Sequence, residues 1–294
     1  MTTLAPVTRA AIVDAGLDPD DVVAVLQRGL AEDLGTVGDL TSFATISPEA
    51  RIDARYVARQ PGVLAGVPVL MTIYDLHAGA DAVCKPELRD GDAFGSGTVI
   101  ATVSGNARDV LGIERLSLNL LGHLCGIATA TSAWVSALDG TPAKVRDTRK
   151  TTPGLRDLEK YAVRCGGGVN HRFGLDDAIL IKDNHIAACG SVAEAVRRAR
   201  ATAGHLMKVE VEVDSLSQLE DALRHQPDVV MLDNFSLADL AQAVRLTAGR
   251  AVLEASGGVT LETVRDIART GVDVISVGAL THSASILDIG LDAA

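Results

Sequence analysis

Cysteine is scarce in this chain of 294 residues, which contains four cysteines far apart in the sequence. None belongs to a CxxC pair or to a Cys/His spacing typical of zinc ligands, and no disulfide framework is indicated. The sequence therefore predicts neither a structural zinc site nor a disulfide-stabilised fold, and a reducing cytoplasm fits this pattern best. The four cysteines are Cys84, Cys125, Cys165 and Cys189.

Positive charge is also in short supply. The chain has 27 Lys and Arg residues against 38 Asp and Glu residues, for a formal net charge of -11. Such a field opposes approach to phosphate-rich surfaces, which excludes a general nucleic-acid or anionic-membrane binder. Any anion site must therefore be a local concentration of positive charge.

A secretory leader is missing from the sequence pattern. Residues 1–21 contain no basic segment followed by a long apolar run, which is what a secretory signal requires. We expect this part of the chain to form a loose first turn or tail.

Residues 116–138 contain no Asp, Glu, Lys or Arg and are long enough to span a bilayer. The stretch is nevertheless interrupted by Ser, Thr, Asn, His and Gly, and no second segment of this kind exists. These features favour a buried core helix, with a break near Gly126, over a membrane span. Within it, His123 is expected to be a hydrogen-bonded core histidine.

The first third of the chain predicts a mixture of helix and small sheet. Residues 20–34 have helical periodicity with acidic residues at the start, where the helix dipole favours them. Residues 38–46 are expected to form a loop. Between residues 51 and 110, short β-rich runs separated by Gly, Pro and Asp predict strands of a small mixed sheet.

After residue 140, short β-rich runs alternate with segments of helical periodicity. This alternation predicts right-handed βαβ units and a parallel sheet. Helices are expected over 191–203, 215–225, 236–248 and 260–270. Strands are expected within 143–149, 177–183, 207–213, 228–234, 251–256 and 272–278.

Polar residues and glycines follow these predicted strands at the point where each strand ends. In a β/α barrel this edge is the rim that carries substrate sites, because strand ends are rigid and the following loops vary freely. An open doubly wound sheet would present the same ends, but no GxGxxG fingerprint accompanies them, so a barrel or incomplete barrel is favoured. The strand-end residues are Arg149, Lys150, Lys182, Glu212, Asp233, Ser256, Gly257 and Gly278.

Residues 144–172 contain eight Lys and Arg residues plus one His in an otherwise acidic chain. Three of the eight, Arg156, Lys160 and Arg164, have helical spacing alongside acidic neighbours and are interpreted as a solvated helix face. The others form two short cationic groups, one at the end of the first strand and one at residues 171–172. Arginine forks suit planar carboxylates and phosphates, so these groups predict an anion site.

Two carboxylates, Glu212 and Asp233, end later strands close to this cationic site. Acids placed in an anion site suggest a metal, and hard oxygen ligands indicate Mg²⁺ bridged to a phosphorylated substrate. A surface-facing acid is the alternative interpretation for Glu212. Residues 256–258 and 276–279 each place glycine after a strand and before a helix, which predicts phosphate cradles, although glycine there can also mark only a tight turn.

The chain resembles the quinolinate phosphoribosyltransferase family over nearly its whole length. The resemblance is carried by GDLTS, by ERLSLNLLGHLCGIATATSAWV and by the long gapless run KVRDTRKTTPGLRDLEKYAVRCGGGVNHRFGLDDAILIKDNH. Further matches are EVEVDSL, MLDNF, ASGGV and SVGALTHS.

The resemblance implies a two-domain α/β fold of the type II phosphoribosyltransferase kind. An open-faced N-terminal α/β sandwich domain is expected over 1–125 and an incomplete β/α barrel, TIM-like, over 126–284. A C-terminal tail, 285–294, is expected to pack back on the N-terminal domain. The family's active site is completed by a neighbouring subunit, which implies at least a homodimer with Arg115 reaching the partner's site.

The resemblance also implies a role for each matching position. The dicarboxylate quinolinate would contact Arg149, Lys150, His171 and Arg172, and Thr148 is a further substrate-binding position. The ribose and magnesium pyrophosphate of phosphoribosyl pyrophosphate would be held by Lys182, Glu212 and Asp233, with Lys150 also expected in the catalytic group. The 5-phosphate would lie at Ser256, Gly257, Gly258, Gly278 and Ala279.

The implied reaction transfers the phosphoribosyl group to quinolinate with loss of carbon dioxide, giving nicotinate mononucleotide for NAD biosynthesis. One alternative is a nicotinate phosphoribosyltransferase, which a site with two carboxylate contacts would disfavour because buried guanidinium groups would lose their partners. A second is a Schiff-base lyase that uses Lys182 as nucleophile. A third is a non-catalytic paralogue of the molybdenum-transport-associated kind.

Overall fold

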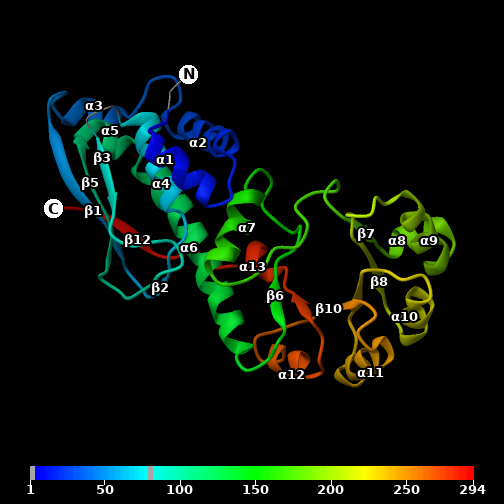
Figure 1. The fold of residues 1–294 in the computed structure, drawn as a ribbon. Helices are drawn as coiled ribbons and strands as arrows, with labels where there is room; N and C mark the ends of the chain where they lie inside the picture. The colour runs from blue at the N-terminus through cyan, green and yellow to red at the C-terminus, as the bar shows by residue number, and fades with distance from the viewer. Residues whose placement is uncertain (1–3, 79–81) are drawn as a thin grey trace. The chain divides into compact units, whose positions relative to one another are not determined.

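The computed structural model describes residues 4–78 and 82–294, which divide into two compact units (Figure 1). The first unit comprises Met1–Ser132, Thr151–Gly167 and Ser283–Ala294, and the second comprises Ala133–Lys150 and Gly168–His282. The chain therefore leaves the second unit after Lys150, contributes a segment to the first and returns. This excursion contains the middle of the basic stretch 144–172.

A four-stranded antiparallel sheet in the order β12-β1-β5-β3 forms the first unit's main sheet. The last strand of the chain pairs with β1, with Ala54 opposite Ala293, so the C-terminal segment belongs to this unit (Figure 1). A two-stranded sheet joins β2 and β4. The strands are β1 Arg51–Ala58, β2 Gly62–Val63, β3 Val83–Pro86, β4 Ala93–Phe94, β5 Val99–Asn106 and β12 Ile289–Ala293.

Helices accompany this sheet, and three of them correct the sequence expectations. The expected helix at 20–34 is confirmed as α2. The expected loose tail is instead helix α1, begun by a proline at its first turn, and the expected loop at 38–46 contains α3, capped by Asp39. Helix α4 was not expected among the strands. The helices are α1 Pro6–Asp14, α2 Pro19–Leu34, α3 Leu40–Thr45, α4 Val67–His77 and α5 Ala107–Gly112.

Helix α6, Glu114–Ala137, is continuous, so the break expected near Gly126 is wrong. Among residues 4–78 and 82–294 it is the one helix long and apolar enough to cross a membrane, and 56% of its apolar window is buried inside the protein. His123 Nε2 lies 2.9 Å from Glu159 Oε1, as expected of a hydrogen-bonded histidine. The glycine inside the helix lets the chain pass close by, because a Cβ at Gly126 would lie 2.1 Å from the Ser285 carbonyl oxygen.

Replacing Gly126 with alanine is expected to lower the free energy of unfolding by about 1–3 kcal/mol, the usual cost of overpacking a filled site. The added methyl group would have to displace the backbone at Ser285. Chemical denaturation followed by circular dichroism measures the change. Gly204→Ala is the matched control, because nothing lies within 4 Å of a Cβ built there. Equal stability of the two variants would contradict the close approach.

Helix α7, Arg156–Cys165, corrects the expectation of a solvated basic face. Lys160 and Glu159 are both fully buried. Glu159 accepts from the Thr152 backbone and contacts His123, and the Arg164 guanidinium donates to the Ala15 carbonyl. The helix charges therefore hold the first unit together and do not face solvent as one surface.

The second unit contains a six-stranded parallel sheet in the order β6-β11-β10-β9-β8-β7. All six strands expected after residue 140 are confirmed, and β6 and β7 are the edges, so the strands form an open sheet and not a closed ring. This is the incomplete barrel that the sequence predicted. The strands are β6 Lys144–Arg146, β7 Ile179–Ile181, β8 Val209–Val213, β9 Val229–Asp233, β10 Val252–Ser256 and β11 Val274–Ser276.

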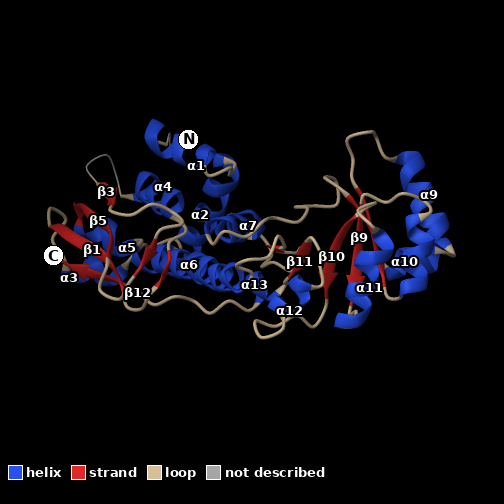
Figure 2. Ribbon diagram, turned by 60° about the horizontal axis from the view of Figure 1, so that its bottom comes forward, coloured by secondary structure: helices blue, strands red, loops and turns tan. Residues whose placement is uncertain are grey.

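The expected helices follow the strands in alternation (Figure 2). Helices α9, α10 and α12 contact strands of the sheet, which is the packing of consecutive βαβ units. The short helices α8 and α13 were not expected. The helices are α8 Asp183–Cys189, α9 Val192–Thr202, α10 Leu216–Leu223, α11 Leu237–Thr247, α12 Val264–Arg269 and α13 Ala279–His282.

Candidate active site

A cavity of about 350 Å³ lies at the carboxyl ends of the parallel strands. Most of the site residues predicted from the sequence line it, although their strands are up to about a hundred residues apart in the chain. The lining residues are Thr148, Arg149, Lys150, His171, Arg172, Leu180, Lys182, Glu212, Met231, Asp233, Ser256 and Ser276. The structure thus brings together cations, carboxylates and small polar groups in one place.

Strand alternation explains why these residues meet. Side chains two residues apart in a strand point to the same face. Lys182 follows Leu180, and Asp233 follows Met231, and all four line the same cavity. The inner face of these strands thus has two layers of side chains in the cavity lining. Lys182 and Asp233 lie at the strand ends, and Leu180 and Met231 lie two residues before them.

The basic part of the wall consists of Arg149, Lys150 and Arg172. Burial and the neighbouring charge of Arg149 lower the pKa of Arg172 below its ordinary value. Two guanidinium groups that repel each other in a partly buried wall favour a bound anion, because an anion relieves the repulsion. The Arg172 guanidinium is also fixed in place, since its Nη1 donates to the Ala178 carbonyl at 2.9 Å.

The acidic part of the wall lies on neighbouring strands. Lys182 Nζ lies 2.7 Å from Glu212 Oε2, which joins the ends of β7 and β8. Asp233 Oδ2 accepts from Asn234 Nδ2 at 2.8 Å. Each carboxylate keeps oxygen atoms beyond these contacts, and hard oxygen donors of this kind suit Mg²⁺. The donor set therefore fits a magnesium ion that takes the rest of its ligands from a substrate or water.

The glycine segments lie at the ends of the last two strands. Gly257 has φ of +88°, and a Cβ there would lie 2.3 Å from Asn234 Oδ1, so only glycine fits this turn. At Gly278 a Cβ would lie 3.0 Å from Lys150 Cδ, so the second glycine segment passes beside the basic wall. Gly258 has φ of +62°, and Ala279 begins α13. Of these four, none belongs to the cavity lining itself.

Arg115 lies in the first unit, exposed near the start of α6. It is not among the residues that line the cavity of the second unit. Its role at a partner's site stays a prediction, as do the substrate contacts of the residues that line the cavity.

A buried polar cluster, the floor, adjoins the cavity, whose lining includes two of its members, His171 and Ser276. Its other members, Arg146, Glu210 and Glu254, do not line the cavity and were missed in the sequence. Glu254 is fully buried, with its Oε2 2.6 Å from Arg146 Nη1 and its Oε1 accepting from Ser276 Oγ at 2.5 Å. Burial and the nearby Glu210 raise the pKa of Glu254. His171 Nε2 lies 3.3 Å from Glu210 Oε2 and 3.8 Å from Glu254 Oε1.

The main chain around His171 is anchored from below by Asp147, which is fully buried. Its Oδ1 accepts from the His171 backbone N–H at 2.8 Å, and its Oδ2 accepts from Asn170 Nδ2 at 2.5 Å. Asp147 follows β6 directly, so the first strand of the sheet holds the second cationic group in place. In the sequence, the acidic Asp147, two residues before the basic pair Arg149 and Lys150, was the signal that could have indicated this anchor.

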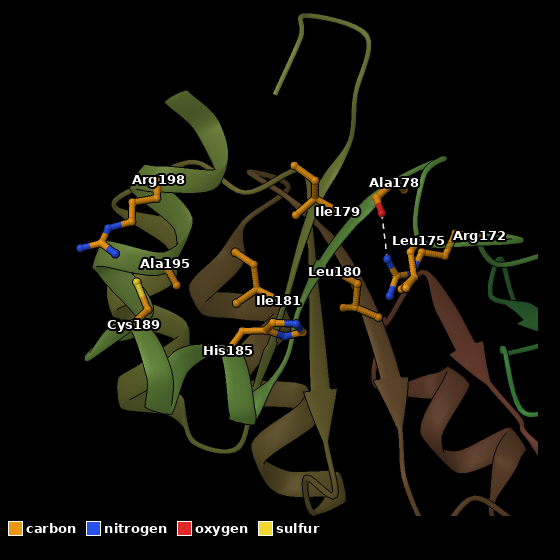
Figure 3. A pocket seen from close by; sticks show the side chains of 10 residues that line it. All are labelled: Arg172, Leu175, Ala178, Ile179, Leu180, Ile181, His185, Cys189, Ala195 and Arg198. Carbon is orange, nitrogen blue, oxygen red and sulfur yellow. Dashed lines mark hydrogen bonds between the residues drawn. The ribbon is translucent and has the colours of Figure 1, made fainter. Parts of the chain in front are cut away.

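A second cavity, also of about 350 Å³, is lined by β7, α8, α9 and the loop before β7 (Figure 3). Its lining is largely apolar, with Ile179 and Ile181 from the strand and Ala195 from α9. Arg172 and Leu180 line both cavities. The bond from Arg172 to Ala178, dashed in Figure 3, therefore lies in the wall that the two cavities share.

Comparison with known proteins gives a consistent family. The model for the N-terminal domain of quinolinate phosphoribosyl transferase matches residues 39–125, and that for the C-terminal domain matches residues 127–292. The nicotinate-nucleotide pyrophosphorylase [carboxylating] of Mycobacterium leprae is 50% identical over 271 residues, covering 91% of this chain and 95% of the relative. The probable enzyme of the same name from Bacillus subtilis is 47% identical over 269 residues, covering 91% and 92%.

Solved structures agree. The nicotinate-nucleotide pyrophosphorylase from Francisella tularensis is 37% identical, with a TM-score of 0.90, and the match covers 95% of this chain and 98% of that one. The two matched domains together span far more than half of the sequence, and the resemblance inferred from the motifs is confirmed. The chain belongs to the quinolinate phosphoribosyl transferase family.

Proposed function

We propose that the protein transfers the phosphoribosyl group of phosphoribosyl pyrophosphate to quinolinate with decarboxylation. The products are nicotinate mononucleotide, pyrophosphate and carbon dioxide, and the reaction consumes one proton. The enzyme is thus a nicotinate-nucleotide pyrophosphorylase of NAD biosynthesis. The observation that carries the proposal is the single cavity that joins a pair of mutually repelling arginines to the Lys182–Glu212 ion pair and Asp233.

The arginine pair is suited to the pyridine dicarboxylate. Arg149, which follows β6, and Arg172, in the loop between α7 and β7, provide planar forks, and Lys150 adds a third cation on the same wall. A monocarboxylate would make one carboxylate–guanidinium contact fewer in this wall, which costs binding free energy. The site therefore favours quinolinate over nicotinate, and the nicotinate phosphoribosyltransferase alternative is disfavoured.

The acidic strand ends are suited to phosphoribosyl pyrophosphate. When bound with this substrate, Mg²⁺ would be held by Glu212 and Asp233 and would neutralise pyrophosphate charge. Lys182 supplies a further positive charge for the departing pyrophosphate, while the two carboxylates stabilise the positive charge that develops on the ribose ring. The glycine segments at 256–258 and 278–279 lie at the ends of β10 and β11, and their main-chain N–H groups are the proposed donors to the 5-phosphate.

Bond changes follow from this arrangement. The C1–O bond to pyrophosphate breaks with its electron pair leaving on oxygen, and the pyridine nitrogen forms the new C1–N bond. The ring becomes cationic and accepts the electron pair left at C2 when the C2 carboxylate departs as carbon dioxide. A proton then replaces the carboxylate at C2. Lys182 is paired with Glu212 at 2.7 Å and is used as a cation, which sets this proposal apart from a Schiff-base lyase.

The test is to incubate the purified protein with quinolinate, phosphoribosyl pyrophosphate and Mg²⁺, and to follow nicotinate mononucleotide by chromatography. Product is expected with quinolinate and not with nicotinate, and a chelator of divalent cations is expected to stop its formation. Equal turnover of nicotinate, or no product from quinolinate, would overturn the proposal. Borohydride treatment during turnover is expected to trap no adduct at Lys182.

Assembly and location are further parts of the proposal. We propose at least a homodimer in which residues 1–125 contribute to the partner's site and Arg115 reaches it. Family membership and the exposure of Arg115 support this assignment. The cytoplasm is the proposed location, supported by four free cysteines, all of them in the described chain.

A shared site predicts complementation between two inactive variants. Arg115→Ala and Lys182→Ala are each expected to be inactive alone, because each removes a cation from every site. After subunit exchange, a mixed dimer has one site that lacks both side chains and one that keeps both, so activity is expected to return in part. Steady-state assays of the mixture measure it. Proven exchange of subunits without any recovery would contradict the shared site.

A further inference from the structure

The buried cluster contains three charged side chains, which are rarely buried in a protein core. Arg146 carries one positive charge, and Glu210 and Glu254 are two carboxylates, all on the inner face of the sheet. Glu254 is occupied by Arg146 and Ser276. Glu210 is different, because its Oε1 is buried and has no hydrogen-bond partner within the described chain. Burying a carboxylate costs free energy unless it is paired with a charge or hydrogen-bonded.

The group that Glu210 faces is His171. The His171 Nε2 atom lies 3.3 Å from Glu210 Oε2, while Nδ1 accepts a hydrogen bond from the Arg172 backbone N–H at 2.7 Å. A ring nitrogen that accepts a hydrogen bond carries no proton. The single proton of the ring is therefore on Nε2, the nitrogen that lies 3.3 Å from Glu210 Oε2. Which ring nitrogen is protonated is set by the partner of the other nitrogen.

This orientation changes what His171 can do. Its Nδ1 atom accepts from the Arg172 backbone and its Nε2 atom lies 3.3 Å from Glu210 Oε2, so both ring nitrogens have neighbours within the protein, and its contact with substrate stays a prediction. The hydrogen bond to its Nδ1 atom holds the main chain at Arg172, one of the two arginines of the basic wall. Glu210 also acts on Arg172 directly, since its negative charge opposes the lowering of the Arg172 pKa by burial and by Arg149.

We propose that Glu210 is a positioning residue for the dicarboxylate site. Its carboxylate, 3.3 Å from Nε2, favours the His171 tautomer with the proton on Nε2, and this leaves Nδ1 to accept from the backbone of Arg172. The expected effect on KM for quinolinate rests on the proposed function, whereas the position of the proton on His171 does not. The floor is thus proposed to position residues that bind quinolinate and to have no role in binding phosphoribosyl pyrophosphate.

Nuclear magnetic resonance of protein labelled with ¹⁵N-histidine tests the structural content without turnover. The signal of His171 is assigned by its loss in His171→Gln. One protonated and one unprotonated nitrogen are expected, with the proton on Nε2. A proton on Nδ1, or on both nitrogens, would overturn the proposal.

The same spectra decide whether the floor is a cation site. The ligand atoms of His171, Glu210 and Glu254 all lie within 4.8 Å of one another, which a divalent metal could bridge. A metal would displace the Nε2 proton. Addition of Zn²⁺, which is diamagnetic, to the complete protein is expected to leave the Nε2 proton of His171 in place. Loss of the Nε2 proton at one equivalent of metal would overturn the proposed role of Glu210.

Two variants of Glu210 separate positioning from packing. Glu210→Met keeps the volume but removes the acceptor, and it is expected to raise KM for quinolinate by about tenfold to 100-fold, the range for loss of an orienting hydrogen-bond partner. KM for phosphoribosyl pyrophosphate is expected to stay unchanged. Glu210→Gln keeps an acceptor oxygen and is expected to restore most of the quinolinate affinity and the Nε2 proton. Glu220→Met, on the exposed face of α10, is the control.

The outcomes are distinguishable from failure of the proposed function. If wild-type protein does not turn over quinolinate, the function fails, while the tautomer of His171 still reports on the floor. If wild-type turns over quinolinate, equal rises of KM for both substrates in Glu210→Met, or no rescue by Glu210→Gln, would overturn the positioning role. Should Glu210→Met not fold, quinolinate binding to Glu210→Gln by calorimetry takes its place, with affinity close to wild type expected and a loss of tenfold or more contradicting the proposal.

Discussion

Lys182→Met is expected to lower kcat by about 10²- to 10³-fold, the cost of removing one group that stabilises charge in the transition state. The Lys182 ammonium lines the cavity and lies 2.7 Å from Glu212. Methionine keeps the length of the side chain but cannot neutralise the departing pyrophosphate. It also leaves Glu212 without its cation, which adds an unfavourable negative charge beside the phosphates. Steady-state kinetics with both substrates saturating measures the change.

The matched control is Lys208→Met, because Lys208 is an exposed lysine of the same unit that pairs with Asp228 at 3.1 Å. Its kcat is expected to equal that of wild type. A Lys182→Met enzyme with kcat within a factor of a few of wild type would remove this residue from the catalytic group.

Arg149→Met is expected to lower kcat/KM for quinolinate by about 30-fold to several thousandfold, which corresponds to the 2–5 kcal/mol lost when one partner of a desolvated charge pair is removed. Burial and the positive charge of Arg149 lower the pKa of Arg172. Loss of Arg149 removes one carboxylate contact while relieving the repulsion. KM for phosphoribosyl pyrophosphate is expected to change little.

Arg197→Met controls for the loss of an arginine from the second unit, because Arg197 is exposed and pairs with Glu194 on α9. It is expected to leave both KM values unchanged. If Arg149→Met weakened both substrates equally, the division of the cavity into a dicarboxylate side and a phosphoribosyl side would be wrong.

Much of the candidate site was predictable because strand periodicity and strand ends are local properties of the sequence. Lys182 and Asp233 each follow an apolar run, Glu212 alternates with valines near the end of its strand, and parallel strands bring their carboxyl ends to one edge of the sheet. The structure places all three in one cavity. The alternation of strands and helices after residue 140 predicted the parallel sheet for the same reason.

Burial could not be predicted where it depends on a partner far away in the chain. Lys160 has the helical spacing of a surface residue but is fully buried, because the excursion 151–167 packs in the first unit. The break expected at Gly126 reflected the low helix propensity of glycine, whereas the structure uses this glycine for close approach of the Ser285 backbone. Tertiary contacts overrode local propensity at both positions.

The floor of the site was missed for a different reason. Glu210 precedes Glu212 by two residues, so the period of a strand puts both on one face, and the same period puts Glu254 below Ser256. The signal was present in VEVEVD and in LEASGG. A buried acid is nevertheless rare enough that composition alone favours a solvent-facing role, and only the position of Arg146 and His171 beneath the cavity explains it.

The most direct measurement of the central claim uses quinolinate labelled with ¹³C in its C2 carboxylate. The purified protein, with phosphoribosyl pyrophosphate and Mg²⁺, is expected to release the label as carbon dioxide in equal amounts with nicotinate mononucleotide and pyrophosphate. A mononucleotide that retains the labelled carboxylate, or carbon dioxide released without formation of the mononucleotide, would contradict the account.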